Sequence, residues 1–433
     1  MKNGKSMFSL LMAVLLMTSI IAVPAFAEEA KKYDVTLNVV GVNNVISEVI
    51  LAHQDELLEK YGIKINFQQF SNEQASNKLA VSFAAGGSDI DAFMFRPLDE
   101  TLLFVQNGWL ENLQPYIDKD PDAAKIDDYY PASLGLCKDA STGNIVGFPL
   151  MVESAVVFYN KTLFKEKGID KLPTTMQELY DTAAKLDDPD NDICGFACRG
   201  AGNPAVTQFS TFLRAFGGDF FDKDGKATIN TPEAVSAFEF YGKLLRDYGP
   251  DGVLNMGWTD TWNLFTQGKA AMRLDADTNI GSWDPDNSLI TLDDIGYFQI
   301  PVGPSGNHGD FLITAWAIGV SAGSANKDAA YTFANWVASP EMQIEVQKKG
   351  GSGARASAWA EKYSSWPAEL QTVADAAAKV AVSTDRPYMI NVAKARDIIG
   401  QVIVAAIEGN TDIQALADEK NAEFQTLLDS EKK

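Results

Sequence analysis

Two acidic loops contain residue types that could bind a metal ion. In the first loop, Asp188, Asp190 and Asp192 alternate along the chain, as the first three ligands of a calcium-binding EF-hand loop do. Such a loop needs a glycine at the next position for its sharp turn, and here Ile193 stands at that position. The first loop therefore lacks the backbone freedom that this kind of calcium site requires.

The second acidic loop has the glycine but lacks other ligands. Asp222 and Asp224 precede Gly225, yet Phe220 stands where the first ligand belongs and no glutamate closes the loop. The sequence Asp-Lys-Asp-Gly is typical of a hairpin turn. We therefore predict a turn here, and neither a metal site nor a cofactor in the chain.

The cysteines and histidines also offer little for disulfide or zinc chemistry. Cys194 and Cys198 would lie about 13 Å apart in a strand, which is too far for a disulfide bond. A bond would need a turn there, or a pairing with Cys137. We expect three buried free thiols. A zinc site would have few ligands, because His53 and His308 are the only histidines. His53 falls in a predicted helix, and His308 lies in a Gly-, Pro- and Ser-rich loop, where we expect it to be solvated.

The N-terminus has the parts of a secretory signal peptide. Lys2 and Lys5 are followed by an apolar stretch over residues 7–23 and by a small-residue site, AFA, that ends at Ala27. Cleavage is expected after Ala27. A transmembrane anchor is the alternative, but the apolar stretch is near the lower limit for a span. No cysteine lies near the cleavage site, so we expect a periplasmic or secreted protein without a lipid anchor.

The charge of the chain limits its partners. The formal charge is −22, and it becomes two units more negative when Lys2 and Lys5 leave with the signal peptide. A chain this acidic repels nucleic acids and anionic lipids. The composition therefore favours a neutral or cationic small-molecule ligand and excludes nucleic acid.

The first third of the mature chain alternates between the two-residue period of strands and the 3.6-residue period of helices. This alternation predicts strands near residues 35–39, 63–67 and 90–95 and helices near residues 45–57 and 71–85. Gly62 is expected to cap the end of the first helix, and Ser71 and Gln74 to form a capping box at the start of the second. Such units form a parallel sheet with helices on its faces, and ligands bind beyond the carboxyl ends of its strands. By position alone, Phe70, Phe95 and Arg96 become candidate pocket residues.

The middle of the chain continues the same plan. A helix is predicted from Thr231-Pro232 to Gly249, and later helices over residues 327–338 and 340–349. No Pro-, Gly- or Ser-rich linker separates two independent halves. Two lobes that share crossing strands would explain that absence.

Residues 143–170, GNIVGFPLMVESAVVFYNKTLFKEKGID, contain two apolar runs separated by a polar break at Glu153 and Ser154. Four later segments are FLRAFGGDFF, FTQGKAAM, IGYFQIPVGPSG and AWAIGVSAGSANKDAAYTFANWVASPE. Together, in this order, they resemble extracellular solute-binding protein family 1, the carbohydrate receptors of ABC importers that are like maltose-binding protein. The order Cys198-Arg199-Gly200, then FLRAFGG, is closest to the branch that binds sugars and sugar alcohols.

The resemblance implies a two-lobed α/β clamshell of type II with a ligand cleft between its lobes. The N-terminal lobe would hold residues 34–151 and 302–345, and the C-terminal lobe residues 152–301 and 346–433. The lobes would close around a ligand by hinge motion. The segment at residues 143–170 would be the first crossing between the lobes.

A sugar or polyol needs a partner for each hydroxyl and an aromatic surface for any apolar face. Where the family places its cleft, the chain offers carboxylates, an amide, arginines and tryptophans. To Phe70 and Arg96 the resemblance adds Glu153, Arg199, Asn203, Trp258, Trp262, Asp275, Asp277, Trp316 and Arg355. In this interpretation Trp316 begins a strand, and Asp275 and Asp277 follow a strand over residues 270–274.

Each of these residues has a structural alternative. The tryptophans could be core, Arg199 could pair with a structural carboxylate, and Asp275 and Asp277 could cap a helix. Glu153 could be a solvated turn residue, and Arg96 could lie on the surface.

Three classes of function are open. We favour a non-enzymatic transport receptor, a monomer, that delivers a sugar or polyol to a membrane permease. The same clamshell could instead bind a polyamine or another cation. A secreted glycoside hydrolase would also combine acids with aromatics. Iron-binding relatives use adjacent tyrosines, and Tyr129-Tyr130 is the one such pair here.

Overall fold

The computed structural model describes residues 32–87, 89–360, 365–409 and 412–431. The predicted signal peptide and its cleavage site lie outside the described residues. Within these ranges, no helix combines the length and the apolar composition needed to cross a bilayer. Seven strands of the described chain form one connected sheet in the order β2-β1-β3-β7-β4-β5, with β6 paired to β4.

The strands and helices have the following bounds. The strands are β1 (Val35–Val42), β2 (Ile63–Phe70), β3 (Ala92–Phe95), β4 (Phe148–Asn160), β5 (Met272–Ala276), β6 (Ile295–Phe298) and β7 (Leu312–Val320). The helices of the first part are α1 (Val45–Ala52), α2 (Gln54–Tyr61), α3 (Asn72–Ala84), α4 (Pro97–Gln106), α5 (Gln114–Lys119), α6 (Pro121–Ala124) and α7 (Pro131–Gly135). The middle helices are α8 (Lys161–Glu166), α9 (Met176–Leu186), α10 (Gly202–Ala215), α11 (Pro232–Tyr248) and α12 (Trp258–Thr266). The last are α13 (Lys327–Val337), α14 (Pro340–Lys348), α15 (Ala368–Val380), α16 (Val392–Glu408) and α17 (Ile413–Glu431).

The N-terminal βαβ units have the predicted order. Strand β1 pairs in parallel with both β2 and β3. Ser71 and Gln74 form the predicted capping box at the start of α3, and Gly62 ends α2 in the left-handed conformation with φ of 74°. One predicted helix is wrong: residues 45–61 form two helices, because the chain breaks at His53, whose Nδ1 lies 3.0 Å from the carbonyl of Val49.

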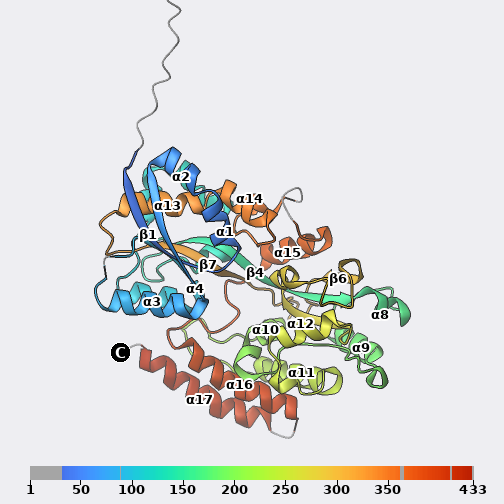
Figure 1. The fold of residues 1–433 in the computed structure, drawn as a ribbon. Coiled ribbons are helices and arrows are strands. Elements are labelled where there is room, and N and C mark those ends of the chain that lie inside the picture. Colours follow the sequence, from blue (N-terminus) through green and yellow to red (C-terminus); the bar gives the residue numbers. More distant parts are fainter. Residues whose placement is uncertain (1–31, 88, 361–364, 410–411, 432–433) are drawn as a thin grey trace, which may run out of the picture.

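Strand β4 connects the two parts of the molecule. Its first half, Phe148–Ser154, pairs antiparallel with β7, and its second half, from Ala155, pairs antiparallel with β5 and β6. In Figure 1 this long strand runs from the blue and orange elements on one side to the yellow and green elements on the other. The two apolar runs predicted around Glu153 are therefore one continuous strand that changes partners after Ser154. The polar break interrupts the sequence pattern and not the backbone.

Two clusters of buried side chains form the core. The first contains residues of β1, β3 and β7, such as Leu37, Phe93 and Ile318. The second contains residues of α10, α11 and α16, such as Phe209 and Phe238, whose rings stack with centroids 4.2 Å apart. Helices α16 and α17 lie side by side below α10 and α11 in Figure 1.

The segment around Arg355 contacts the N-terminal part of the chain. The sequence assigns residues 346–433 to the C-terminal lobe, but Trp359 and Trp366 pack in the first cluster. Arg355 also donates hydrogen bonds to the carbonyls of Ala124 and Lys125, which lie in the N-terminal part. Arg355 thus links this segment to the N-terminal part, and the lobe boundaries stay a prediction.

Candidate functional site

Two cavities meet at Glu153, where β4 changes partners. The first, here called the Trp258 cavity, has a volume of about 400 Å³ and is lined by Asn44, Met151, Glu153, Arg199, Trp258 and Thr278, among others. The second, here called the Arg386 cavity, has a volume of about 180 Å³ and is lined by Asn72, Arg96, Asp99, Glu153, Trp316 and Arg386, among others. Both cavities draw residues from the two sides of the crossing strand. This is where the predicted cleft would lie.

Glu153 is half-buried and lines both cavities. Its Oε1 accepts a hydrogen bond of 3.2 Å from the hydroxyl of Thr278. Burial raises the pKa of Glu153, while the Thr278 hydroxyl and the nearby Arg199 act in the opposite direction. A carboxylate with free lone pairs in a cavity is a strong acceptor for hydroxyl donors.

Arg199 lines the Trp258 cavity and is held from behind by Asp275. The carboxylate of Asp275, at the end of β5, is fully buried and accepts a hydrogen bond of 2.9 Å from Nε of Arg199 and a second from its Nη2. Nη2 of Arg273 lies 3.0 Å from the same carboxylate. Burial opposes the charge of Asp275, but the two guanidinium groups outweigh it and its pKa is lowered. Asp275 is therefore a support for Arg199, and it does not line either cavity.

Asp277 lies behind the cleft and joins two crossing segments. It begins a short 3-10 helix after β5, is fully buried, and accepts hydrogen bonds from the backbone N–H (3.2 Å) and the hydroxyl (2.5 Å) of Ser154. Burial raises the pKa of Asp277 to about 7, against the lowering effect of these hydrogen bonds. Asp277 is thus a residue of the joint between β4 and β5, and only its neighbours Ala276 and Thr278 line the cavity.

The raised pKa of Asp277 predicts a pH-dependent stability. The folded state holds this proton up to about pH 7, whereas the unfolded state loses it near pH 3.8, so the free energy of unfolding should fall as pH rises between these values. The slope from one such group is about 1.4 kcal/mol per pH unit. In Asp277→Asn, which mimics the protonated form, thermal unfolding from pH 4 to 7 should show a flatter decline of stability. Equal slopes in the variant and the parent chain would contradict the raised pKa.

The two tryptophans of GWTDTW have different surroundings. Trp258 is the first residue of α12, is 43% exposed and lines the cavity that carries its name. Trp262 is only 4% exposed and packs edge-on against Phe158, with its indole N–H donating to the carbonyl of Ser282. The structure therefore places Trp258 at the cavity and Trp262 in the core, where it lines neither cavity.

Arg96 and Trp316 line the Arg386 cavity. Arg96 follows β3, as predicted, and its Nη1 lies 3.4 Å from Asp99. Trp316 is 8% exposed and lies in the middle of β7, not at the start of a strand as the sequence suggests. Phe95 is fully buried in an aromatic core and takes no part.

Besides Trp262, Asp275 and Asp277, three more predicted site residues line neither cavity. Asn203 bonds to helix α16, where its Nδ2 donates to Asp397 at 2.7 Å. Arg355 is fully buried, and its guanidinium group donates hydrogen bonds to backbone carbonyls. The same group lies over the ring of Tyr129, with its Cζ 4.0 Å from the ring centroid. Phe70 ends β2 half-buried against the first core cluster. Arg355 and Asn203 thus hold segments together, because their polar atoms already have protein partners.

The cavities also contain residues that the sequence did not single out. Asn44 caps α1 by accepting from the N–H groups of Ile46 and Ser47, and within the described residues its buried Nδ2 has no hydrogen-bond partner. Arg386 comes from the connection before α16. The Asn44 cap could have been read from the start of α1. Arg386 stands about 230 residues beyond Glu153, and no local pattern relates the two positions.

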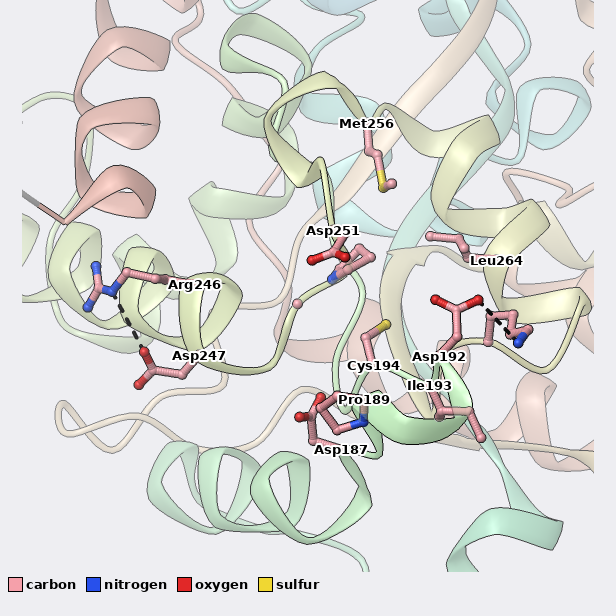
Figure 2. A pocket seen from close by; sticks show the side chains of 13 residues that line it. Asp187, Pro189, Asp192, Ile193, Cys194, Arg246, Asp247, Asp251, Met256 and Leu264 are labelled. Carbon is pink, nitrogen blue, oxygen red and sulfur yellow. Dashed lines mark ion pairs between the residues drawn. The ribbon is translucent and has the colours of Figure 1, made fainter.

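The first acidic loop lines a further cavity, away from Glu153, and its aspartates pair with lysines. Figure 2 shows this cavity, of about 280 Å³, between the loop at Asp187–Cys194 and the residues that follow α11. Asp192 is paired with Lys269 at 3.2 Å, and Asp188 with Lys167 at 3.3 Å. Among the residues that the structure describes, no group of three or more His, Cys, Asp or Glu side chains could hold a metal ion.

The remaining sequence motifs also have structural roles. Asp222 makes the predicted turn, accepting from the N–H groups of Asp224 and Lys226. Cys137, Cys194 and Cys198 are buried free thiols, as predicted. The hydroxyl of Tyr130 donates to Asp375, and that of Tyr129 to the carbonyl of Ala338. His308, expected to be solvated, is half-buried and contacts the carbonyl of Ile300.

Comparison with known proteins identifies the family. A family model described as bacterial extracellular solute-binding protein matches residues 43–344, well over half of the chain. The chain belongs to the bacterial extracellular solute-binding protein family. The expectation from the sequence motifs is thereby confirmed.

Individual relatives of this solute-binding protein agree with the family. A mannitol-binding protein of Pseudomonas aeruginosa is 27% identical over 79% of this chain and 78% of its own length. An erythritol/L-threitol-binding protein of Mycolicibacterium smegmatis is 26% identical over 68% of this chain and 65% of its own length. A crystal structure of an ABC transporter solute-binding protein from Agrobacterium radiobacter in complex with ribitol has a TM-score of 0.76 at 25% identity, covering 92% of this chain and 100% of that one.

These relatives confirm the expected two-lobed α/β fold and the role of an ABC importer's substrate-binding protein. Proteins of this family are extracellular or periplasmic, and they bind substrates without being enzymes. The cavities at Glu153 therefore lie where the long strand of a solute-binding protein changes its partners.

Proposed function

We propose that this solute-binding protein is exported by its signal peptide, captures a sugar or sugar alcohol between its lobes and delivers it to a membrane permease. The observation that carries the proposal is the composition of the Trp258 cavity. It combines a half-exposed indole, a carboxylate acceptor on Glu153 and a guanidinium donor on Arg199. The relatives that bind mannitol, erythritol and ribitol support the same ligand class.

The chemistry of this cavity suits a neutral ligand with many hydroxyls. Each hydroxyl that leaves water needs a partner, because an unpaired one costs about 1–3 kcal/mol. Glu153 accepts from hydroxyls, Arg199 and Asn44 donate to their oxygens, and the indole of Trp258 covers apolar C–H groups.

The alternatives have less support. A polyamine would need several free carboxylates, yet among the described residues Glu153 is the one acidic side chain that lines the Trp258 cavity. Asp275 is bonded to two arginines and Asp277 to Ser154. A glycoside hydrolase would be an enzyme, and the family consists of binding proteins. We further propose that the mature chain begins after Ala27 and acts as a monomer whose lobes close by rotation about β4 and the neighbouring crossing segments.

A thermal-shift screen tests the ligand class. The panel is D-mannitol, D-glucitol, ribitol, erythritol, D-glucose, maltose and spermidine. We expect at least one carbohydrate to raise the melting temperature, because a ligand at a hundredfold excess over its Kd stabilises by about 2.7 kcal/mol. Calorimetric titration of the best ligand confirms binding. A shift with spermidine alone would favour the cation alternative, and no shift with any carbohydrate would overturn the proposal.

A further inference from the structure

Two arginines flank Glu153 in the same arrangement. Arg199 lines the Trp258 cavity on one side of Glu153, and Arg386 lines the Arg386 cavity on the other. Each side chain is mostly buried, with 13% and 16% of its surface exposed. The two arginines come from segments far apart in the sequence, so their matching geometry is a property of the folded chain.

A fully buried aspartate holds each arginine. Asp275 binds Nε and Nη2 of Arg199, and Asp385 binds Nε (2.6 Å) and Nη2 (2.7 Å) of Arg386. Such two-point contacts fix the plane of a guanidinium group. Within the part of the chain that the structure describes, neither Nη1 group makes a hydrogen bond, and Nη1 of Arg386 lies 3.6 Å from Asp99. Nη1 of Arg199 is therefore left as a donor, while Nη1 of Arg386 is ion-paired with Asp99 and keeps its hydrogen-bond capacity for a ligand.

The aspartates also reduce the positive charge around the arginines. Asp275 offsets one of the two charges of Arg199 and Arg273, and Arg386 is paired both with Asp385 and with Asp99. Burial raises the pKa of Glu153 and outweighs Arg199 and Arg386, which act in the opposite direction, while Asp385 adds to the upward shift. The cavities thus present two fixed donors and one acceptor without a strong excess of positive charge.

We infer that Asp275 and Asp385 are paired positioning residues that tune this cleft to neutral polyols and against sugar acids. The inference rests on the proposed function and adds a specificity to it. Each aspartate aims one Nη1 donor at a ligand oxygen beside Glu153. Each also offsets one positive charge that would otherwise attract a carboxylate. Arg386 is, in this arrangement, a ligand-binding residue in the second cavity.

The variant Asp385→Asn tests the inference. The probes are the neutral ligand that gives the largest shift in the screen and the sugar acid with the same carbon chain, for example D-mannitol and D-mannonate. Removing the negative charge should weaken binding of the neutral ligand about tenfold, because Nη1 is no longer aimed. Binding of the sugar acid should weaken less or improve, so the ratio of the two dissociation constants should shift about tenfold toward the acid. The shift should shrink in high salt.

Three further variants distinguish a change in ligand preference from a loss of structure. In the double variant Asp385→Asn/Arg386→Gln no unpaired charge is left, so neutral binding should fall without any gain for the acid. Arg386→Gln alone leaves Asp385 unpaired and should penalise the acid more than the neutral ligand, which keeps the test valid if Asp385→Asn does not fold. Asp247→Asn removes the partner of Arg246 at 3.6 Å in the cavity of Figure 2 and should leave both affinities unchanged.

The failures of the two proposals are distinguishable. If the parent chain binds no carbohydrate, the proposed function fails. If it binds the neutral ligand but the ratio of affinities is the same in the parent chain, in Asp385→Asn and in Arg386→Gln, the function stands and the positioning role is wrong.

Discussion

Replacing Glu153 with alanine is expected to weaken carbohydrate binding about ten- to a hundredfold while leaving the fold intact. Glu153 lines both cavities, and its carboxylate is the acceptor that they share. Hydrogen bonds to a charged group contribute about 1.5–3 kcal/mol, and each 1.4 kcal/mol is a factor of ten in affinity. Calorimetric titration with the ligand found in the screen measures the loss.

The stability of the Glu153→Ala variant should change little. The side chain is half-buried and has one hydrogen bond, from Thr278. A matched control is Glu59→Ala. Glu59 is an exposed glutamate on α2 and lines neither cavity. Unchanged affinity in Glu153→Ala would show that the cleft lies elsewhere.

Replacing the two tryptophans of α12 with alanine should have opposite effects. Trp262 is in the core against Phe158 and Phe265, so Trp262→Ala should lower the free energy of unfolding by about 3–5 kcal/mol. Trp258 is 43% exposed, so Trp258→Ala should cost little stability. It should instead weaken binding about tenfold, because the apolar face of the ligand loses its aromatic partner.

Chemical denaturation measures the stability of the two variants, and calorimetric titration measures their ligand affinity. Each variant serves as the control for the other. They carry the same substitution one helical turn apart, so differences in helix propensity nearly cancel. The different surroundings of the two side chains are the reason for the different effects. The indole N–H of Trp262 donates to the carbonyl of Ser282, and the Cζ atom of Arg273 lies 5.2 Å from the centroid of the Trp262 ring. A large stability loss in Trp258→Ala with unchanged affinity would mean that its indole packs and does not bind.

Local patterns in the sequence predicted the elements well. The capping box at Ser71, the cap at Gly62 and the Thr231-Pro232 helix start all have the expected geometry, because they depend on neighbouring residues. His53 is the exception, since nothing in the apolar periodicity of residues 45–57 marks the point where α1 ends and α2 begins.

The sequence by itself determined the family, the βαβ order and the polar break at Glu153, since these follow from motifs and short-range periodicity. Only the tertiary structure decided which polar residues line the cleft. Trp258 and Trp262 are alike in sequence, and Arg199 and Arg355 both follow small residues, yet one of each pair lines a cavity while the other is buried with protein partners. The physical reason is that burial and hydrogen-bond partners come from distant segments. Arg386 beside Glu153 and Asp277 beside Ser154 are contacts that only the folded chain creates.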